Sequence, residues 1–426
     1  MNTYETYKPI SLPWLHYVPS HWDMVRNKVV MKESKNTVGD ESSKYTLLSL
    51  TKSGVIVRDL TQMKGKFPSD FSTYKIVEDE QIIFCLFDID ETPRTVGLSH
   101  HSGMITGAYD VFYITGINPK YLQYYYLSLD NVKAMRPLYT GLRKVIGMTT
   151  FMQISLPLPP RTEQDQIVCF LDWKLSQINR LINAKKKQIA LLQDQKRVVV
   201  NEAVMNAAWS TRRLKTFLKE SNDAVGDKAD EYDLLSLTKG GVIIRDLSTG
   251  KGKFPSDFGT YKVVRAGQII FCLFDIDETP RTVGLSYNDG MITGAYDVFS
   301  ISDIEPKFLE YYFIAIDNVK GLKPLYSGLR KVVNKEKFLQ IQVPIPPIKE
   351  QQSIVVELDA KCACINRLIE KINTEIKFLN EYRIRLISDV ATGKIDVRNE
   401  TVPDYEAIEE TAENESLVVN EEELYE

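Results

Sequence analysis

The sequence repeats itself once, with a constant offset of 187 residues, as from 82 to 269. The segment IIFCLFDIDETPRTVGLS at 82–99 recurs unchanged at 269–286, and GMITGAYDVF at 103–112 recurs at 290–299. Solenoid repeats span roughly 20–50 residues, so this longer period indicates a duplicated domain. The chain is therefore two copies of one unit. Two copies of one surface are expected to pair about a pseudo-two-fold axis.

Each copy begins with a part whose pattern mixes strands and a helix. The apolar run GQIIFCLF at 267–274 predicts a buried strand, and GVIVRDL and YDVFYI predict shorter strands between Gly, Pro, Asp and Ser residues. Pro119 is typical of a helix start, and Leu122, Tyr125 and Leu129 follow it along one stripe. We therefore expect a mixed α/β domain here.

The second part of each copy follows proline-rich breakers, LPLPP at 156–160 and VPIPP at 343–347. Apolar residues then recur at heptad spacing for about four heptads, which predicts two helices of about 45 residues each. One such helix could pack on its own domain, but two of this length are hard to bury on small domains. We expect them to form an antiparallel coiled coil. The predicted seam comprises Leu171, Leu175, Ile178, Ile182, Ile189, Leu192, Leu358, Ile365, Ile369, Ile372, Ile376 and Leu379.

These patterns predict an α+β fold class. Two duplicated mixed α/β domains are separated by two long helices that form an antiparallel coiled coil, with pseudo-two-fold symmetry. The expected organisation is a first globular domain at 1–155, a central long helix at 156–208, a second globular domain at 209–342, a C-terminal long helix at 343–398 and an acidic, disordered tail at 399–426.

The net charge of the chain hides an uneven distribution. The formal value of −4 combines 53 Lys and Arg with 57 Asp and Glu. Eleven of these acids lie at 399–426, which has no Lys or Arg, so residues 1–398 carry a net charge of +7, that is −4 plus 11. A mildly basic body is compatible with a nucleic-acid ligand, whereas the tail has the composition of a disordered segment.

Several classes of protein are disfavoured by composition. The five cysteines form no C-x-x-C pair and there are only four histidines, so neither a zinc site nor a disulfide framework is expected. No apolar run reaches the roughly 18 residues that span a bilayer, and the N-terminus lacks the apolar stretch of a signal peptide. We therefore expect a cytoplasmic protein without a membrane partner.

The two copies differ in how well their parts match. Residues 48–112 are identical to 235–299 at 52 of 65 positions, whereas 161–205 match 348–392 at only 14 of 45. A coiled-coil seam needs only apolar residues in register, so it tolerates divergence. Near-identity of the globular parts means that both present the same surface. A ligand of one is therefore expected to be a ligand of the other.

Motifs for catalysis are weak. The chain has no G-x-x-x-x-G-K-[ST] nucleotide loop and no Asn/Asp-Pro-Pro-aromatic tetrapeptide of adenine methyltransferases. The sharpest acidic cluster is Asp88, Asp90 and Glu91, which the repeat carries to 275, 277 and 278. These carboxylates could bind a divalent metal in a nuclease, but Asp residues also stabilise turns after buried strands. We favour the turn, and a metal-dependent nuclease remains the alternative.

Basic, hydroxyl and aromatic side chains of the globular parts form a candidate DNA-binding set. Lys and Arg neutralise phosphates, and Arg and Thr can contact base edges. Several members lie on glycine-containing loops, where binding residues concentrate. Each alone is more often a solvated surface residue. The candidates are Lys52, Arg58, Lys64, Lys66, Thr73, Arg94, Thr95, Tyr109, Arg143 and Lys144, with Lys239, Arg245, Lys251, Lys253, Thr260, Arg281, Thr282, Tyr296, Arg330 and Lys331 in the second copy.

Short motifs at the domain borders carry a resemblance to a known family. Trp14 to Trp22 follow the pattern W-L-x-x-[VI]-P-x-H-W. P-L-P-P at 157–160 precedes Glu-Gln at 163–164, and P-I-P-P at 344–347 precedes Glu-Gln at 350–351. In this layout the chain, to about residue 398, resembles the specificity (S) subunit of type I restriction–modification enzymes. The acidic tail is not part of that pattern.

The resemblance implies a division of labour. Two target recognition domains would each grip half of a split site on double-stranded DNA, and the long helices would space them. The S subunit of this family has no catalytic activity and no cofactor. Two modification subunits methylate adenine with S-adenosylmethionine, and two restriction subunits translocate and cut DNA with ATP and Mg²⁺. An orphan DNA-binding adaptor of the same fold is a further alternative.

Near-identical domains sharpen the expected target. Domains related by a pseudo-dyad read opposite strands, so two copies of one surface are expected to read the same base pairs at each end. The predicted target is an interrupted palindrome. The helices are expected to pack together through their seams and to dock modification subunits through their outer faces.

Overall fold

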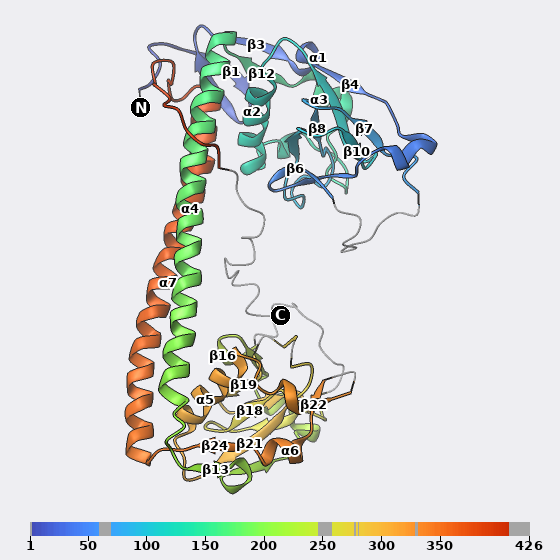
Figure 1. Ribbon diagram of the computed structural model, residues 1–426. Helices are drawn as coiled ribbons and strands as arrows, with labels where there is room; N and C mark the ends of the chain where they lie inside the picture. The colour runs from blue at the N-terminus through green and yellow to red at the C-terminus, as the bar shows by residue number, and fades with distance from the viewer. Residues whose placement is uncertain are drawn as a thin grey trace. The chain divides into compact units, whose positions relative to one another are not determined.

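The computed structural model describes residues 2–58, 70–245, 258–276, 278–279, 281–328 and 331–408. The chain forms two compact units. The first contains Met1–Ala184 and the chain from Glu375 to residue 408, and the second contains Lys185–Thr374. Each unit therefore holds one globular copy and one half of each long helix, which Figure 1 shows as α4 and α7.

A four-stranded antiparallel sheet is the centre of the first globular copy. Its order is β4 (Met31–Ser34), β11 (Asp110–Ile114), β8 (Ile82–Phe84) and β9 (Val96–Leu98). Two-stranded pairs surround it: β1 (Tyr7–Leu12) with β2 (Leu15–Pro19), β3 (Asp23–Arg26) with β12 (Ser155–Leu158), β5 (Leu48–Thr51) with β6 (Gly54–Val57), and β7 (Lys75–Val77) with β10 (Gly103–Ile105). The helices are α1 (Asn27–Val30), α2 (Pro119–Asn131) and α3 (Met148–Gln153).

Aromatic side chains join this sheet to its helices. The Phe84 ring lies 4.8 Å from both Tyr126 of α2 and Phe151 of α3, and 5.8 Å from Phe112 of β11. All four side chains are buried. The predicted helix at Pro119 is confirmed, and its stripe of Leu122, Tyr125 and Leu129 is buried because it packs on the domain.

The second globular copy repeats this architecture. Its sheet has the order β14 (Leu218–Ser221), β21 (Asp297–Ile301), β18 (Ile269–Phe271) and β19 (Val283–Leu285). The other pairs are β13 (Thr211–Arg213) with β24 (Gln342–Pro344), β15 (Leu235–Thr238) with β16 (Gly241–Ile244), β17 (Lys262–Val264) with β20 (Gly290–Ile292), and β22 (Tyr326–Ser327) with β23 (Val332–Val333). Its helices are α5 (Pro306–Asn318) and α6 (Lys335–Leu339).

Two differences separate prediction from structure in the copies. The apolar run at 267–274 forms only the short strand β18, because the chain turns at Asp275, whose φ is +46°. The first copy also carries the hairpin β1–β2, whose repeat-equivalent residues in the second copy belong almost entirely to a long helix. That hairpin is an addition to the duplicated unit.

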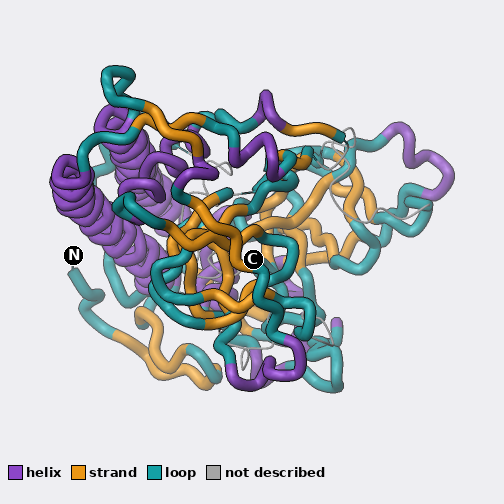
Figure 2. Tube along the Cα trace, turned by 90° about the horizontal axis from the view of Figure 1, so that it is seen from below, coloured by secondary structure: helices purple, strands orange, loops and turns teal. Residues whose placement is uncertain are grey.

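The long helices are α4 (Arg161–Val204) and α7 (Ile348–Ala391), of 44 residues each. Both views show them side by side (Figure 1 and Figure 2). The first unit holds the beginning of α4 and the end of α7, and the second holds the opposite halves, so the pair is antiparallel in each. In the second unit Lys196 Nζ of α4 donates to Asn366 Oδ1 of α7 at 2.9 Å.

Every residue of the predicted seam is buried or half-buried. The fully buried members are Leu171, Ile178, Ile182, Ile189, Leu358, Ile365 and Ile376. The half-buried ones are Leu175, Leu192, Ile369, Ile372 and Leu379. No helix in the described ranges is long and apolar enough to cross a membrane.

The first part of the acidic tail binds to α4. Gln166 Nε2 donates to the carbonyls of Val397 and Glu400 at 3.0 and 2.7 Å. Ser176 Oγ donates to Glu406 O and accepts from Ile408 N, at 3.0 and 2.9 Å. We call residues 397–408 the C-terminal strap. The prediction of disorder is wrong for 399–408, because α4 side chains satisfy the strap backbone; residues 409–426 lie outside the described residues.

Each globular copy is clamped to the start of its long helix by one glutamine. Gln164 Oε1 accepts from the backbone N–H of Asn118, the N-cap of α2, at 2.7 Å, and its Nε2 donates to Pro159 O at 2.8 Å. In the second copy Gln351 makes the same two bonds, to the N–H of Glu305 and the carbonyl of Pro346, at 2.9 and 2.8 Å. The Glu-Gln motif therefore fixes the domain to the helix.

An aspartate further along the same long helix completes this clamp. Lys120 Nζ lies 2.7 Å from Asp172 Oδ2, and Tyr124 also donates to Asp172. The second copy repeats the arrangement, with Lys307 2.8 Å and the Tyr311 hydroxyl 2.6 Å from Asp359. The aspartate and the glutamine hold two successive turns of the short helix against the long one, so the joint resists rotation.

The neighbouring glutamate differs between the copies. Glu163 is 5% exposed and accepts from the hydroxyl of Tyr4 at 2.6 Å and from Trp22 Nε1 at 2.9 Å, while His21 Nε2 lies 2.7 Å from its other oxygen. Burial, followed by the bond to Glu163, raises the pKa of Tyr4 far above its ordinary range. In the second copy Glu350 is exposed and accepts from Trp209 Nε1 at 3.2 Å. The N-terminal segment thus buries one of two equivalent carboxylates.

Replacing Gln164 with alanine should destabilise the first unit. The half-buried N–H of Asn118 and the buried carbonyl of Pro159 would lose their partner, which costs about 1–3 kcal/mol. Differential scanning calorimetry of the full chain should show a lower unfolding midpoint. Gln188→Ala, an exposed glutamine on the same helix, is the matched control and should leave the midpoint unchanged. Equal midpoints for both variants would contradict the clamp.

Candidate nucleic-acid interface

Three of the predicted DNA-binding residues lie at one edge of the first copy. The ring of Tyr109 stacks on Phe87, with centroids 6.1 Å apart and planes 27° apart. The Arg143 guanidinium lies 5.5 Å from the centroid of the same Phe87 ring. A Cβ at Gly107 would lie 2.3 Å from the carbonyl of Thr73, so only glycine permits this turn to approach Thr73. Phe87 and Gly107 therefore assemble Thr73, Tyr109 and Arg143.

The second copy repeats what the structure describes of this edge. Tyr296 stacks on Phe274 with centroids 5.9 Å apart and planes 25° apart. Gly294 approaches the carbonyl of Thr260 as closely as its counterpart does, at 2.4 Å from an added Cβ. Arg330 lies outside the described residues. Thr260 and Tyr296 thus occupy places equivalent to those of Thr73 and Tyr109.

Residues 140–145 form a tight hairpin beside this edge, here named the 140–145 hairpin. Thr140 and Val145 exchange backbone bonds of 3.0 and 3.1 Å, and the N–H of Lys144 donates to the carbonyl of Gly141 at 3.1 Å. Gly141 has a φ of +74°, which glycine adopts without strain. Leu142 at the tip is fully exposed, and the Arg143 side chain is 75% exposed.

The acidic cluster anchors this hairpin. Asp90 accepts from Arg136 Nε and from the Tyr139 hydroxyl, both at 2.8 Å, and lies 3.3 Å from Lys144 Nζ. The bond from Tyr139, followed by those from Arg136 and Lys144, holds the pKa of Asp90 below its ordinary value. The anchor is therefore complete above the ordinary carboxyl pKa and is lost only as the pH falls through the lowered one.

These contacts do not favour the nuclease alternative. Asp90 is paired on both oxygens, Glu91 lies 3.4 Å from Lys144 Nζ, and Asp88 lies 3.7 Å from Arg143 Nη2. Among the residues that the structure describes, no group of three or more His, Cys, Asp or Glu side chains is placed to hold a metal ion. The second-copy cluster includes position 277, which is outside the described residues. The turn interpretation of the cluster accounts for its geometry.

Arg94 and Thr95 belong to a structural network instead of an open surface. Thr95 is fully buried, and its N–H and hydroxyl donate to Asp130 at 3.1 and 2.7 Å. Arg94 Nη1 lies 3.1 Å from Asp130 and 2.9 Å from Asn131 Oδ1. Lys133 Nζ also donates to Asp130, at 2.8 Å. These residues pack the start of β9 on α2. The sequence pattern did not reveal this structural role.

The second copy repeats this network with looser geometry. Arg281 Nη1 and the N–H of Thr282 lie 3.4 and 3.3 Å from Asp317 Oδ2, and Thr282 is 2% exposed. Thr95 and Thr282 were predicted to contact DNA, but both side chains are buried inside their domains. Arg94 and Arg281 are partly exposed, but their guanidinium groups bind buried carboxylates.

The remaining candidates lie on hairpins or outside the described residues. Lys52 and Lys239 are exposed at the turns of β5–β6 and β15–β16, and Arg58 and Arg245 follow these hairpins half-buried. Lys144 pairs with Asp90 and Glu91, and Lys331 lies 3.5 Å from Glu278 Oε1. Four lysines cannot be placed: Lys64, Lys66, Lys251 and Lys253 lie outside the described residues.

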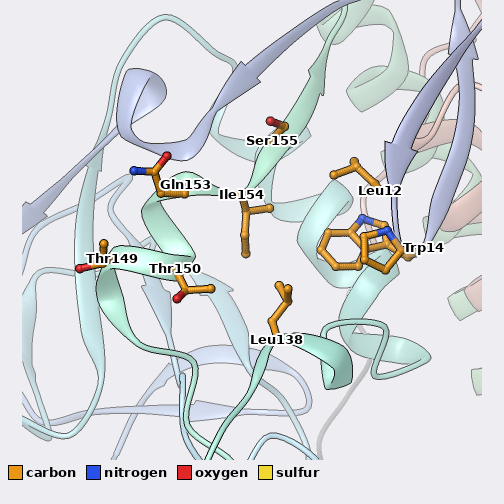
Figure 3. Close-up of a pocket in the computed structure, with 9 residues that line it drawn as sticks. Leu12, Trp14, Leu138, Thr149, Thr150, Gln153, Ile154 and Ser155 are labelled. Atoms are coloured by element: carbon orange, nitrogen blue, oxygen red, sulfur yellow. The ribbon is translucent and has the colours of Figure 1, made fainter.

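A hollow of about 420 Å³ lies between the β1–β2 turn and α3. Figure 3 shows Leu12 and Trp14 of the hairpin facing Leu138, Thr150 and Ile154. Trp14 Nε1 donates to the hydroxyl of Tyr125 at 3.1 Å, which fixes the hairpin on α2. The nine lining residues include no ionisable side chain, so the hollow offers no group for acid–base chemistry.

The predicted set omitted Phe87, Leu142 and Arg136. Phe87 lies in the segment that recurs unchanged at 269–286, and the tripeptide GLR at 141–143 recurs at 328–330. Identity between the copies was therefore the available signal. Identity between the copies does not distinguish residues that pack the domain from residues that bind a ligand, because buried Thr95 is repeated as faithfully as exposed Arg143.

The double variant Arg94→Ala with Arg281→Ala should lose stability and keep its ligand discrimination. Each buried aspartate would lose a charged hydrogen bond worth about 1.5–3 kcal/mol. Thermal unfolding should occur at a lower midpoint. Fluorescence anisotropy should give an unchanged ratio of affinities for cognate and mismatched duplexes.

The exposed pair Lys52→Ala with Lys239→Ala serves as the control for that variant. Its midpoint should equal that of the wild type. Normal stability together with lost discrimination in the arginine variant would instead return Arg94 and Arg281 to the DNA-binding set.

Comparison with known proteins gives one consistent family. The family model of the type I restriction modification DNA specificity domain matches residues 106–191 and 281–377. The putative type I restriction enzyme MjaX specificity subunit of Methanocaldococcus jannaschii is 20% identical over 434 residues, with 89% of this chain and 95% of that protein covered. The type I restriction enzyme MjaVIII specificity subunit of the same organism is 25% identical over 289 residues, covering 58% and 64%.

A solved structure supports the fold. It is described as the structural basis underlying complex assembly and conformational transition of the type I R-M system, and matches with a TM-score of 0.63 at 14% identity over 89% of this chain and 99% of that chain. The two matched segments fall one in each copy of the repeat, as the duplication requires. In each copy the chain is thus similar, over the matched segment, to the DNA specificity domain of type I restriction–modification systems.

Proposed function

We propose that this chain is a type I restriction–modification specificity subunit that recognises double-stranded DNA, with each globular copy reading one half of a split site. The observation that carries the proposal is the duplicated edge, in which an aromatic stack places Tyr109 beside Arg143 and Tyr296 in the equivalent position. Cationic side chains neutralise phosphates, and hydroxyl and guanidinium groups contact base edges. The net charge of +7 for residues 1–398 favours a polyanionic ligand.

The target is an interrupted palindrome with the same base pairs at both ends. The copies match at 52 of 65 positions across 48–112 and 235–299, so their reading surfaces share one chemistry. Copies related by a pseudo-dyad, as the duplication predicts, would present these surfaces to opposite strands. Unlike surfaces would be needed to read an asymmetric site.

The chemistry of methylation and cleavage belongs to partner subunits. Two modification subunits would methylate adenine with S-adenosylmethionine, and two restriction subunits would translocate and cut DNA with ATP and Mg²⁺. This assignment agrees with the pairing of the acidic cluster in the first copy by Arg136, Tyr139 and Lys144. It places the complex in the cytoplasm, where it meets DNA.

Methylome sequencing of a strain that expresses this chain with its partners tests the target. A palindromic motif with a fixed central gap should carry methylated adenine on both strands. Deletion of the gene for this chain should abolish the modification. Two unrelated half-sites would contradict the palindrome while leaving DNA recognition intact.

The purified chain by itself should be catalytically silent. Incubation with plasmid DNA and Mg²⁺ should leave the plasmid intact, and incubation with radiolabelled S-adenosylmethionine should transfer no methyl group. Addition of the modification subunits should restore transfer. Cleavage by the chain alone would revive the nuclease alternative, and failure to co-purify with any modification subunit would favour an orphan adaptor.

A further inference from the structure

Leu142 is the most exposed large apolar residue of the described structure, with the side chain fully open to solvent at the tip of the 140–145 hairpin. Burying a leucine side chain contributes roughly 1.5–3 kcal/mol of favourable free energy, and a leucine left exposed to solvent does not contribute it. Isolated exposed apolar residues are common on protein surfaces, and exposure alone would carry nothing. The scaffold around this leucine is what distinguishes it.

Backbone and side-chain contacts hold the 140–145 hairpin rigidly in place. Two backbone bonds tie its second arm to the segment that follows β8: Ile146 N donates to Leu86 O, and Asp88 N donates to Arg143 O, both at 2.9 Å. Asp90 holds Tyr139 and Lys144 on the two arms. A flexible loop would lose entropy on binding, whereas this hairpin is already ordered. The acidic cluster thus maintains the tip in one pose.

The second copy repeats the scaffold where it is described. Lys331 N donates to Gly328 O at 3.1 Å, Val333 N donates to Leu273 O at 2.8 Å, and Gly328 has a φ of +76°. Lys331 pairs with Glu278 as Lys144 pairs with Glu91. The described residues on either side of positions 329 and 330 are therefore placed as in the first copy, which is expected of an element that serves both halves of a repeated target.

The charge beside the tip favours DNA over a protein as the occupant. Arg143 follows Leu142 and is 75% exposed, and its guanidinium is placed by the Phe87 ring at 5.5 Å and by Asp88 at 3.7 Å. Phe87 also stacks on Tyr109, so the tip adjoins the edge already assigned to DNA. An apolar residue next to a positioned arginine matches a groove, where bases are apolar in part and phosphates line the rim.

We propose that the 140–145 hairpin enters a groove of the DNA, with Leu142 contacting bases and Arg143 neutralising a phosphate. The inference rests on the proposed DNA recognition and adds the element that performs it. Leu142 supplies an apolar contact to a thymine methyl group or a base step, and Arg143 fixes the hairpin on the backbone. Asp90 is a positioning residue, since it acts through Tyr139 and Lys144.

Photo-crosslinking tests the contact directly. The full chain, purified with its modification subunits, carries p-benzoylphenylalanine in place of Leu142 and is irradiated with a labelled duplex that contains the methylated motif. The label should transfer to this chain. The same substitution at Val29, which is 61% exposed in the same unit, is the matched control and should not crosslink. Crosslinking of position 142 only to a modification subunit would overturn the proposal in favour of a protein contact.

Equilibrium binding measures what the contact contributes. Leu142→Ala should bind the motif duplex roughly tenfold more weakly than the wild type, and Val29→Ala should bind as the wild type. Arg143→Ala should weaken binding to motif and scrambled duplexes alike and reduce the salt slope by about one. Unchanged affinity in both hairpin variants would overturn the inference. A wild-type complex that binds neither duplex would instead refute the proposed function itself.

Discussion

The joint between each globular copy and its long helix is the constraint on which the rest depends. A buried glutamine and an aspartate, Gln164 with Asp172 and Gln351 with Asp359, hold the short helix of each copy at two successive turns. A single contact would act as a hinge, whereas two contacts on one helix face set a direction. Joints that do not rotate fix the direction of each globular copy relative to the helix halves of its own unit.

The long helices and the globular copies have diverged to different extents between the two repeats. The seam of the long helices keeps apolar character but not residue identity: Leu175 corresponds to Cys362 in the repeat, and both are at least half-buried. The globular copies keep side chains one by one, since turns such as Gly107 over Thr73 tolerate no added atom. The divergence pattern therefore follows from what each part must preserve.

The repeat, the helix lengths and the seam were predictable from the sequence, because periodicity reports directly on which face is buried. The DNA-binding residues were harder to predict from the sequence. Thr95 and Arg143 are repeated equally well, yet one satisfies a buried aspartate and the other faces solvent, and only long-range contacts such as that to Asp130 separate them. The tail misled for a related reason: its acids predict disorder, but Val402, Tyr405 and Ile408 lie half-buried against α4.

The C-terminal strap makes the two halves of a symmetrical sequence unequal. Ser176 is buried beneath the strap, whereas its repeat counterpart on α7, Ala363, is exposed. A protein that docks on both helices would meet one sheltered face and one bare face. Its affinity for the two helices should therefore differ, although their sequences are related by the repeat.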